Sequence, residues 1–334
     1  MLTLVITVII VALIFDFING FHDTANAIAT VVSTGVLPLK TAILLAAALN
    51  FIGALTGTAV ASTIGKGIIT AETITLVVVL SALCGAIFWN LFTWYYGIPS
   101  SSSHAMVGGL VGAGLAHSGI GSIQAAGMIK ICSSLVMSPI LGMLVAFTFM
   151  LILYWVFRRA APVGVSGLFR RLQMLSAGFM ALSHGSNDAQ KTMGIITMAL
   201  VAYGALEMTG PKLTVPTWVI FASAAAMGLG TAAGGVRIIK TLGTKIIDLK
   251  PVHGFAAETA AAAVIMSASH FGLPVSTTHC ISGSILGVGA SQSVSAVRWG
   301  ITVRILYAWI LTIPISAACA YGFYHLTSWL TGIQ

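Results

Sequence analysis

The sequence predicts an all-α, polytopic membrane protein, and three observations carry this prediction. Of the 334 residues, 58% are hydrophobic and only 7% are charged, whereas soluble domains carry about 25% charged residues. Apolar runs of about 18 residues or more, enough for a helix to cross about 30 Å of hydrocarbon, recur from one end of the chain to the other. Two polar motifs within these runs recur in the second half. We therefore expect two inverted repeats of about five membrane segments each, with broken helices and half-helices at the centre.

The first predicted helix covers residues 2–33 and contains the polar stretch DFINGFHDTANAIAT at 16–30. Residues 183–197, SHGSNDAQKTMGIIT, repeat its pattern. Backbone groups freed from a helix are tolerated in a membrane only where they line a cavity. We therefore expect both helices to be broken at the glycine of the motif and the two breaks to form one divided site. The corresponding residues, 165 positions apart, are Gly20 with Gly185 and Asp23 with Asp188.

The remaining segments follow in the same order in both halves. Glycine-rich segments at 98–116 and 272–290 are short, and fewer than about 17 apolar residues do not span a bilayer comfortably. Each is therefore a half-helix, a re-entrant hairpin or a tilted short span. Their GxxxG spacings, at 108–112 and 283–287, predict close helix packing. The other predicted spans are 41–62, 74–96 and 123–157 in the first half and 215–235, 253–270 and 296–327 in the second.

The two short segments start with the same pattern. PSSSSH at 99–104 and PVSTTH at 274–279 lie 175 residues apart. Proline favours a helix start, the hydroxyls after it can cap the helix, and the free amides and positive dipole end of a helix start bind anions. Two such starts, related by inversion, would converge on one tetrahedral oxyanion. The predicted anion-binding residues are Ser101, Ser102, Ser103, Ser276, Thr277 and Thr278.

A basic connection, residues 158–171, contains four arginines and no acid and divides the chain into 1–157 and 172–334. An odd number of crossings in each half gives the two copies opposite orientations in the membrane. Lysine and arginine concentrate in cytoplasmic loops, and the connection and the basic stretch 237–250 fall on the same side. We therefore expect a multi-pass protein of the cell membrane with both termini outside. These loops also account for the net charge of +8, so no nucleic-acid partner is expected.

Carboxylates within the membrane indicate a cation site. A charged side chain near the middle of a bilayer costs roughly 2.5 to 3.5 kcal/mol on insertion scales, so it is retained where it faces a cavity or a partner. Asp23 and Asp188, with Asn26 and Gln190 nearby, offer oxygen ligands to a hard cation or accept a proton. Because carboxylates repel an anion, we expect a co-transported cation between them and the substrate.

Three further side chains belong to the predicted site. Lys191 stands where the first motif has Asn26, and it either pairs with one of the two aspartates or contacts the substrate as a point charge, as lysine does at phosphates. His22, next to Asp23, is a candidate for proton handling because unperturbed histidine changes charge between pH 5 and 8. Glu258, another acid within the membrane, is a candidate for the coupling ion or proton. No metal site is assigned, and no cofactor is expected beyond a co-transported H⁺ or Na⁺.

Two other classes of membrane protein, channels and enzymes, fit the sequence less well. A channel would also need helix starts within the membrane, but its pore should form from rings of an oligomer, whereas this chain supplies both halves itself. An enzyme would need a nucleophile or a metal constellation, and no HExxH, GxSxG or P-loop motif is present. The sequence thus predicts a transporter and not an enzyme, with an anion channel as the alternative from a different class.

The motifs NGFHDTANA at 19–27, HGSNDAQK at 184–191 and GLPVSTTH at 272–279 resemble those of the PiT family of inorganic phosphate transporters, in order and spacing over nearly the whole chain. The resemblance implies secondary active uptake of phosphate by alternating access, with a site between two inverted repeats. It also implies site roles for the two aspartates of the motifs, for Asn26 and for the Ser/Thr helix starts.

The coupling ion and the partners follow from the same resemblance. The FHDTANA motif together with Lys191 resembles the bacterial members that couple to protons or carry a metal–phosphate complex. We therefore expect a proton symporter, with a sodium-coupled symporter and a sulfate permease of the same fold as alternatives. The expected partners are inorganic phosphate, alone or as a divalent-metal complex, the lipid bilayer, and a second copy of the chain in a homodimer.

Overall fold

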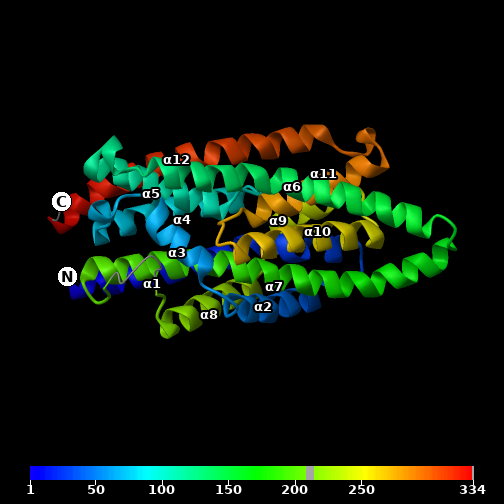
Figure 1. The fold of residues 1–334 in the computed structure, drawn as a ribbon, viewed down its shortest axis with the longest axis horizontal. Helices are drawn as coiled ribbons and strands as arrows, with labels where there is room; N and C mark the ends of the chain where they lie inside the picture. The colour runs from blue at the N-terminus through cyan, green and yellow to red at the C-terminus, as the bar shows by residue number, and fades with distance from the viewer. Residues whose placement is uncertain (208–213, 333–334) are drawn as a thin grey trace.

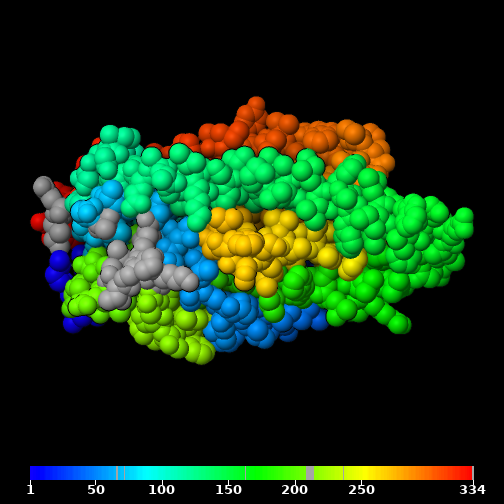
Figure 2. All heavy atoms as spheres, in the orientation of Figure 1, coloured from blue at the N-terminus to red at the C-terminus, as the bar shows by residue number. Residues whose placement is uncertain are grey.

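The computed structural model describes residues 1–207 and 214–332, without the side chains of residues 65, 66, 71, 162 and 236. This part of the chain is a bundle of helices that run along the long axis of the molecule (Figure 1) and pack into one elongated body (Figure 2). It contains no strand beyond an isolated bridge between Ile69 and Ile123. The α-helices are α1 (Leu2–Ser33), α2 (Leu39–Ala54), α3 (Ala59–Gly67), α4 (Leu76–Tyr95), α5 (Ser102–Ser118), α6 (Ala125–Phe157), α7 (Pro162–Tyr203), α8 (Thr217–Ala233), α9 (Val236–Thr244), α10 (Pro251–His270), α11 (Thr277–Gln292) and α12 (Trp299–Thr331).

Several helices are suited to cross a membrane. Within the described residues, α1, α4, α6 and α12 are long and apolar enough to do so, and α8 with α9, bent by 76° at a short break, makes a fifth candidate. Only 22% of the most apolar window of α6 is buried. Such an apolar outer surface is stable in contact with lipid chains. The expected all-helical, multi-pass membrane protein is therefore confirmed.

The helix order recurs along the chain. α4 and α10 begin 175 residues apart, at residues 76 and 251, and so do α5 and α11, at residues 102 and 277. α6 and α12, both of 33 residues, each follow one of the short helices. Figure 1 shows both chain ends at one end of the bundle and the turn between α6 and α7 at the other. The helices thus form two similar series, α1–α6 and α7–α12.

The two expected short helices are present. α5 has 17 residues and lies towards the end of the bundle that carries the termini, whereas α11 has 16 residues and lies towards the opposite end (Figure 1). Their starts meet, since Ser103 Oγ donates to the carbonyl oxygen of Val275 over 3.3 Å. A Cβ on Gly108 would lie 2.5 Å from the carbonyl oxygen of Ile313 in α12, and Gly283 packs in the same way on α6. The close packing expected of the GxxxG spacings is confirmed.

The breaks expected at Gly20 and Gly185 are wrong. α1 and α7 are continuous helices of 32 and 42 residues. A Cβ on Gly20 would lie 2.5 Å from the carbonyl oxygen of Met227 in α8, and one on Gly185 would overlap the backbone of Asn50 in α2. Both glycines therefore allow two helices to touch, and neither interrupts the hydrogen bonds of its own helix.

Most of the predicted basic loop, residues 158–171, is helical in the structure. α6 ends at Phe157 and α7 begins at Pro162, so only residues 158–161 are not helical. Proline suits the first position of a helix because its ring sets φ and the missing N–H would have no intrahelical partner there. The remaining basic residues thus lie on the first turns of α7.

Candidate functional site

Two helix starts meet inside the bundle. α5 is capped by Ser101, whose hydroxyl accepts a hydrogen bond from the backbone nitrogen of His104 over 3.2 Å. α11 is capped in the same way by Ser276, which accepts from the backbone nitrogen of His279 over 3.2 Å. The first-turn amides that remain free and the positive ends of both helix dipoles are directed towards the place where the starts meet. The capping predicted from the Pro-x-Ser pattern is confirmed.

Each helix start contacts a buried aspartate. Asp23 on α1 accepts a hydrogen bond from Ser102 Oγ over 3.4 Å, and Asp188 on α7 accepts one from Thr277 Oγ1 over 3.1 Å. The two carboxylates are 2% and 0% exposed. Asp23 also lies 2.6 Å from Nδ1 of His22. Ser102 and Thr277 are 175 residues apart, like the two helix starts, so the two aspartates hold equivalent places.

Two further contacts cross between the halves of the chain. Asn26 Nδ2 donates to Thr278 Oγ1 over 2.9 Å, and Lys191 Nζ donates to Ser103 Oγ over 2.5 Å. Asn26 and Lys191 correspond in the two polar motifs, and Ser103 and Thr278 correspond in the two helix starts, so the contacts form a matched pair. Lys191 Nζ also lies 2.5 Å from Asp188 Oδ1. Lys191 thus pairs with an aspartate, as one of its two predicted roles requires, and it also reaches the helix start that is predicted to bind the anion.

The cluster combines donors for an anion with ligands for a cation. The free amides, the Ser and Thr hydroxyls and the Lys191 ammonium can donate to a tetrahedral oxyanion. Asp23, His184 and Asp188 each place one ligand atom within 4.8 Å of the others, which is close enough to share a cation. The carboxylate oxygens suit a hard cation, and the imidazole extends the choice to transition metals. This group takes Asp23 from the first half of the chain and His184 and Asp188 from the second.

Comparison with known proteins identifies the family. A family model described as the Phosphate transporter family matches residues 19–166 and 158–320, which include both polar motifs and both helix starts. The chain belongs to the phosphate transporter family.

Individual relatives agree with this assignment. The chain is 51% identical over 319 residues to a probable low-affinity inorganic phosphate transporter of Bacillus subtilis (strain 168), covering 95% of both chains. It is 50% identical over 324 residues to a protein of the same description from Rhizobium meliloti (strain 1021), covering 96% of both. A solved structure described as the sodium-dependent phosphate transporter matches with a TM-score of 0.87 and 26% identity, covering 98% of this chain and 99% of that one. The expected family and the expectation of a transporter, not an enzyme, are confirmed.

In this member of the phosphate transporter family, Gln190 lies apart from the site for which it was predicted. Its Oε1 accepts from the backbone nitrogen of Val60 at the start of α3 over 2.8 Å, and its Nε2 donates to the carbonyl oxygen of Ser186 over 2.6 Å. Side chains two positions apart on an α-helix point in directions about 200° apart around the helix axis. Gln190 therefore points away from the face of α7 that carries Asp188, and it fastens α3 to α7.

Glu258 belongs to a second polar cluster. Its carboxylate accepts hydrogen bonds from Thr30 Oγ1 over 2.5 Å, from Gln173 Nε2 over 3.1 Å and from the hydroxyl of Ser176. Thr30 follows Asn26 by one turn of α1, which places this cluster about 6 Å further along the helix axis. Glu258 thus lies beside the central site and not in it.

Two side chains at the site do not belong to the predicted set of site residues. His184 Nε2 lies 3.4 Å from Asp188 Oδ2, and its Nδ1 lies 3.1 Å from Asn50 Oδ1. Thr93 Oγ1 on α4 lies 3.1 Å from Nε2 of His22 and so fixes the second nitrogen of that ring. The four-residue spacing of His184 and Asp188 places them on one helix face, and this spacing is the available signal. Nothing in the sequence around Thr93 indicates its contact.

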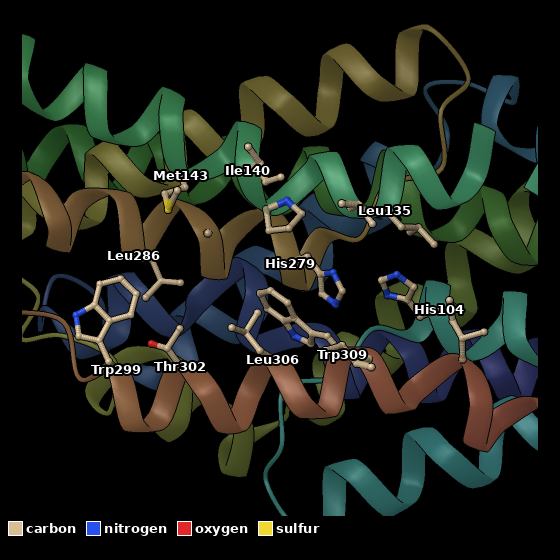
Figure 3. A pocket seen from close by; sticks show the side chains of 15 residues that line it. His104, Leu135, Ile140, Met143, His279, Leu286, Trp299, Thr302, Leu306 and Trp309 are labelled. Carbon is tan, nitrogen blue, oxygen red and sulfur yellow. The ribbon is translucent and has the colours of Figure 1, made fainter. Parts of the chain in front are cut away.

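A groove of about 520 Å³ opens between α6, α11 and α12, behind the helix starts (Figure 3). His104 and His279 lie side by side in it, with ring centroids 4.4 Å apart, and Trp309 stacks on His279 at 3.9 Å. Most of the remaining lining is apolar, such as Ile140 and Leu306. An apolar lining does not replace the hydrogen bonds that an anion loses with water. The Ser/Thr cluster, and not this groove, is therefore the candidate anion site.

Proposed function

We propose that this member of the phosphate transporter family is a secondary active transporter that moves inorganic phosphate together with a cation by alternating access. The observation that carries the proposal is the double contact of Lys191, which joins the Ser103 helix start to the Asp188 carboxylate. A phosphate at this place would accept hydrogen bonds from two helix starts and their hydroxyls. It would also accept a charge-assisted hydrogen bond from Lys191.

A cation is needed at the same place for electrostatic reasons. Two unit charges 4 Å apart interact by about 4 kcal/mol at an effective dielectric constant of 20. Repulsion of this size between phosphate and a carboxylate would lower the affinity by roughly a thousandfold. A cation held by Asp23, His184 and Asp188, whose ligand atoms lie within 4.8 Å of one another, replaces the repulsion by attraction. Phosphate then binds well only when the cation is bound, which is the basis of coupling.

The proposed coupling ion is the proton. His22 Nδ1 lies 2.6 Å from Asp23 Oδ1, and histidine is the side chain whose unperturbed charge change falls between pH 5 and 8. The imidazole of His184 beside the two aspartates also favours a divalent metal–phosphate complex as a form of the substrate. Sodium is the alternative, because the related solved structure is described as sodium-dependent and carboxylate oxygens also bind sodium.

Alternating access is proposed to use the two halves of the chain, 1–157 and 172–334, as inverted repeats joined by 158–171. The matched contacts of Asn26 with Thr278 and of Lys191 with Ser103 support this proposal. Two repeats of opposite orientation can exchange conformations, and the exchange opens a fixed central site to one side and then to the other. The proposed orientation places both termini outside the cell membrane.

Counterflow in proteoliposomes tests the proposal. Vesicles that contain the purified protein and unlabelled phosphate should take up labelled phosphate transiently above its equilibrium level, which a channel cannot do. Protein-free vesicles are the control for leakage. Absence of counterflow from folded protein would contradict the transporter, and equal counterflow of labelled sulfate would assign a broader oxyanion specificity.

The coupling ion is tested in the same vesicles. In sodium-free medium an inward proton gradient should drive phosphate accumulation. Accumulation that appears only when a sodium gradient is imposed would replace the proton by sodium, and Asp23 and Asp188 would then be sodium ligands.

A further inference from the structure

A second group of unpaired polar side chains lies on α1, before the central site. Asp16 is 0% exposed, and within the part of the chain that the structure describes neither of its carboxylate oxygens has a hydrogen-bond partner. Asn19, one turn further on, is also 0% exposed, and both of its amide atoms lack a partner. Residues three apart share a helix face. Thr192 on α7 faces Asp16 without completing a regular hydrogen bond, and its hydroxyl is unpaired as well.

No described side chain neutralises Asp16. The charged groups that act on it, Asp188 and Lys191 of α7, are paired with each other at 2.5 Å, so their fields largely cancel. α4 and α8, which also pack on α1, contain no Asp, Glu, Lys, Arg or His. α9 does carry cations, but it packs on a later part of α1, where Gly243 meets Ala29. Intramembrane acids either pair with another group or line an ion path, and Asp16 has no pair.

We propose that Asp16, Asn19 and Thr192 form a cation site of their own, which binds one coupling cation in addition to the cation at the central site. A carboxylate, an amide carbonyl and a hydroxyl are hard oxygen ligands of the kind that coordinate sodium, and the carboxylate also accepts a proton. Because the site contains a single carboxylate, which balances one positive charge, the proposed occupant is a small monovalent cation. This inference rests on the proposed function, because a site for a coupling cation has a role only in a symporter.

The site lies at one end of a polar face of α1 that is about 21 Å long, at 1.5 Å per residue. The other end reaches the Glu258 cluster through a hydrogen bond of 2.5 Å. With the N-terminus outside, as proposed, the new site lies nearest the outside, the central site follows it along α1, and Glu258 lies furthest from the outside. The residues of this face, spaced by three or four positions and all buried, are Asp16, Asn19, Asp23, Asn26 and Thr30.

The test measures the accumulation of phosphate in proteoliposomes, with the membrane potential clamped at zero. One arm imposes a tenfold inward proton gradient in sodium-free medium, and the other imposes a tenfold inward sodium gradient at equal pH. Asp16→Asn removes the charge and keeps the shape, and Thr192→Val removes one ligand. Asp248→Asn is the matched control, because Asp248 is exposed and pairs with Arg298 at the surface. Gel filtration in detergent verifies that each variant is folded.

The expected result is a loss of one coupled cation. In whichever arm drives the wild type, Asp16→Asn should lower the accumulation ratio about tenfold, because each coupled cation multiplies this ratio by its own gradient. Thr192→Val should also lower the accumulation ratio, and Asp248→Asn should accumulate phosphate as the wild type does. In Asp16→Asn, the exchange of labelled for unlabelled phosphate without any gradient should be reduced less, relative to the wild type, than the accumulation ratio is.

Two results would overturn the inference. One is an accumulation ratio equal to that of the wild type in both folded variants, Asp16→Asn and Thr192→Val. The other is an equal loss of exchange and accumulation, which would make Asp16 part of the phosphate site. Failure of the proposed function is visible separately, because the wild type itself would then show no exchange.

Discussion

Replacement of Lys191 by asparagine tests the anion site most directly, because asparagine already occupies the corresponding position, Asn26, in the first half. Lys191 Nζ lies 2.5 Å from Ser103 Oγ and is placed to donate to an anion held there. A hydrogen bond to a charged group contributes about 1.5 to 3 kcal/mol, so its loss should raise the half-saturating phosphate concentration roughly 10-fold to 150-fold. Asn26 retains its own contact with Thr278, so the second helix start remains in place.

The same substitution has a separate effect on stability. It leaves Asp188 buried without its ammonium partner, and breaking a buried ion pair costs about 3 to 5 kcal/mol. Lys191→Asn should therefore unfold at a lower temperature than the wild type. The double variant Lys191→Asn with Asp188→Asn removes the uncompensated charge, so it should recover stability and still fail to transport phosphate.

The assay is the initial rate of counterflow over a series of phosphate concentrations, normalised to the amount of folded protein. Lys40→Asn is the matched control, because Lys40 is an exposed lysine at the start of α2. An unchanged half-saturating concentration in folded Lys191→Asn would remove this lysine from the anion site. A double variant that transports phosphate normally would refute the role of both partners.

Four further variants probe the same cluster. Asp23→Asn and Asp188→Asn should each reduce uptake by about 30-fold or more, since a buried charge partner is lost while the shape is kept; wild-type uptake by either folded variant would exclude that carboxylate. Thr277→Val with Thr278→Val should raise the half-saturating phosphate concentration by roughly 100-fold or more through the loss of two hydrogen bonds to a charged acceptor, and an unchanged value would move the anion elsewhere. His22→Gln should flatten the pH dependence of proton-driven uptake in sodium-free vesicles, and a pH profile identical to the wild type would assign the proton to another group.

The helix starts were predictable because their signal is local. Proline followed two residues later by serine specifies a capped helix start within a single turn, and Ser101 and Ser276 do cap α5 and α11. Contacts between distant segments, such as Asn26 with Thr278, were predictable only because the motifs recur. The internal repeat supplied the long-range information that a single sequence otherwise lacks.

Other features depend on neighbours that the sequence does not reveal. A glycine within an apolar helix is compatible with a break or with a close contact, and only the position of α8 decides that Gly20 makes a contact. Helix periodicity could have separated Gln190 from His184, because two residues from Asp188 is the opposite face and four residues is the same face. Proximity in sequence to Asp188 was thus less informative than the angle around α7.

The half-helices are held by helices of the opposite half. α5 packs through Gly108 and Gly112 on α12, and α11 packs through Gly283 and Gly287 on α6. During synthesis the first half of the chain must therefore stay in the membrane with the glycine face of α5 uncovered until α12, which follows the other described helices, is made. The order of translation thus leaves the two helix starts without their full support until α12 is made, and a chain truncated before α12 would contain both aspartates but no closed site between them.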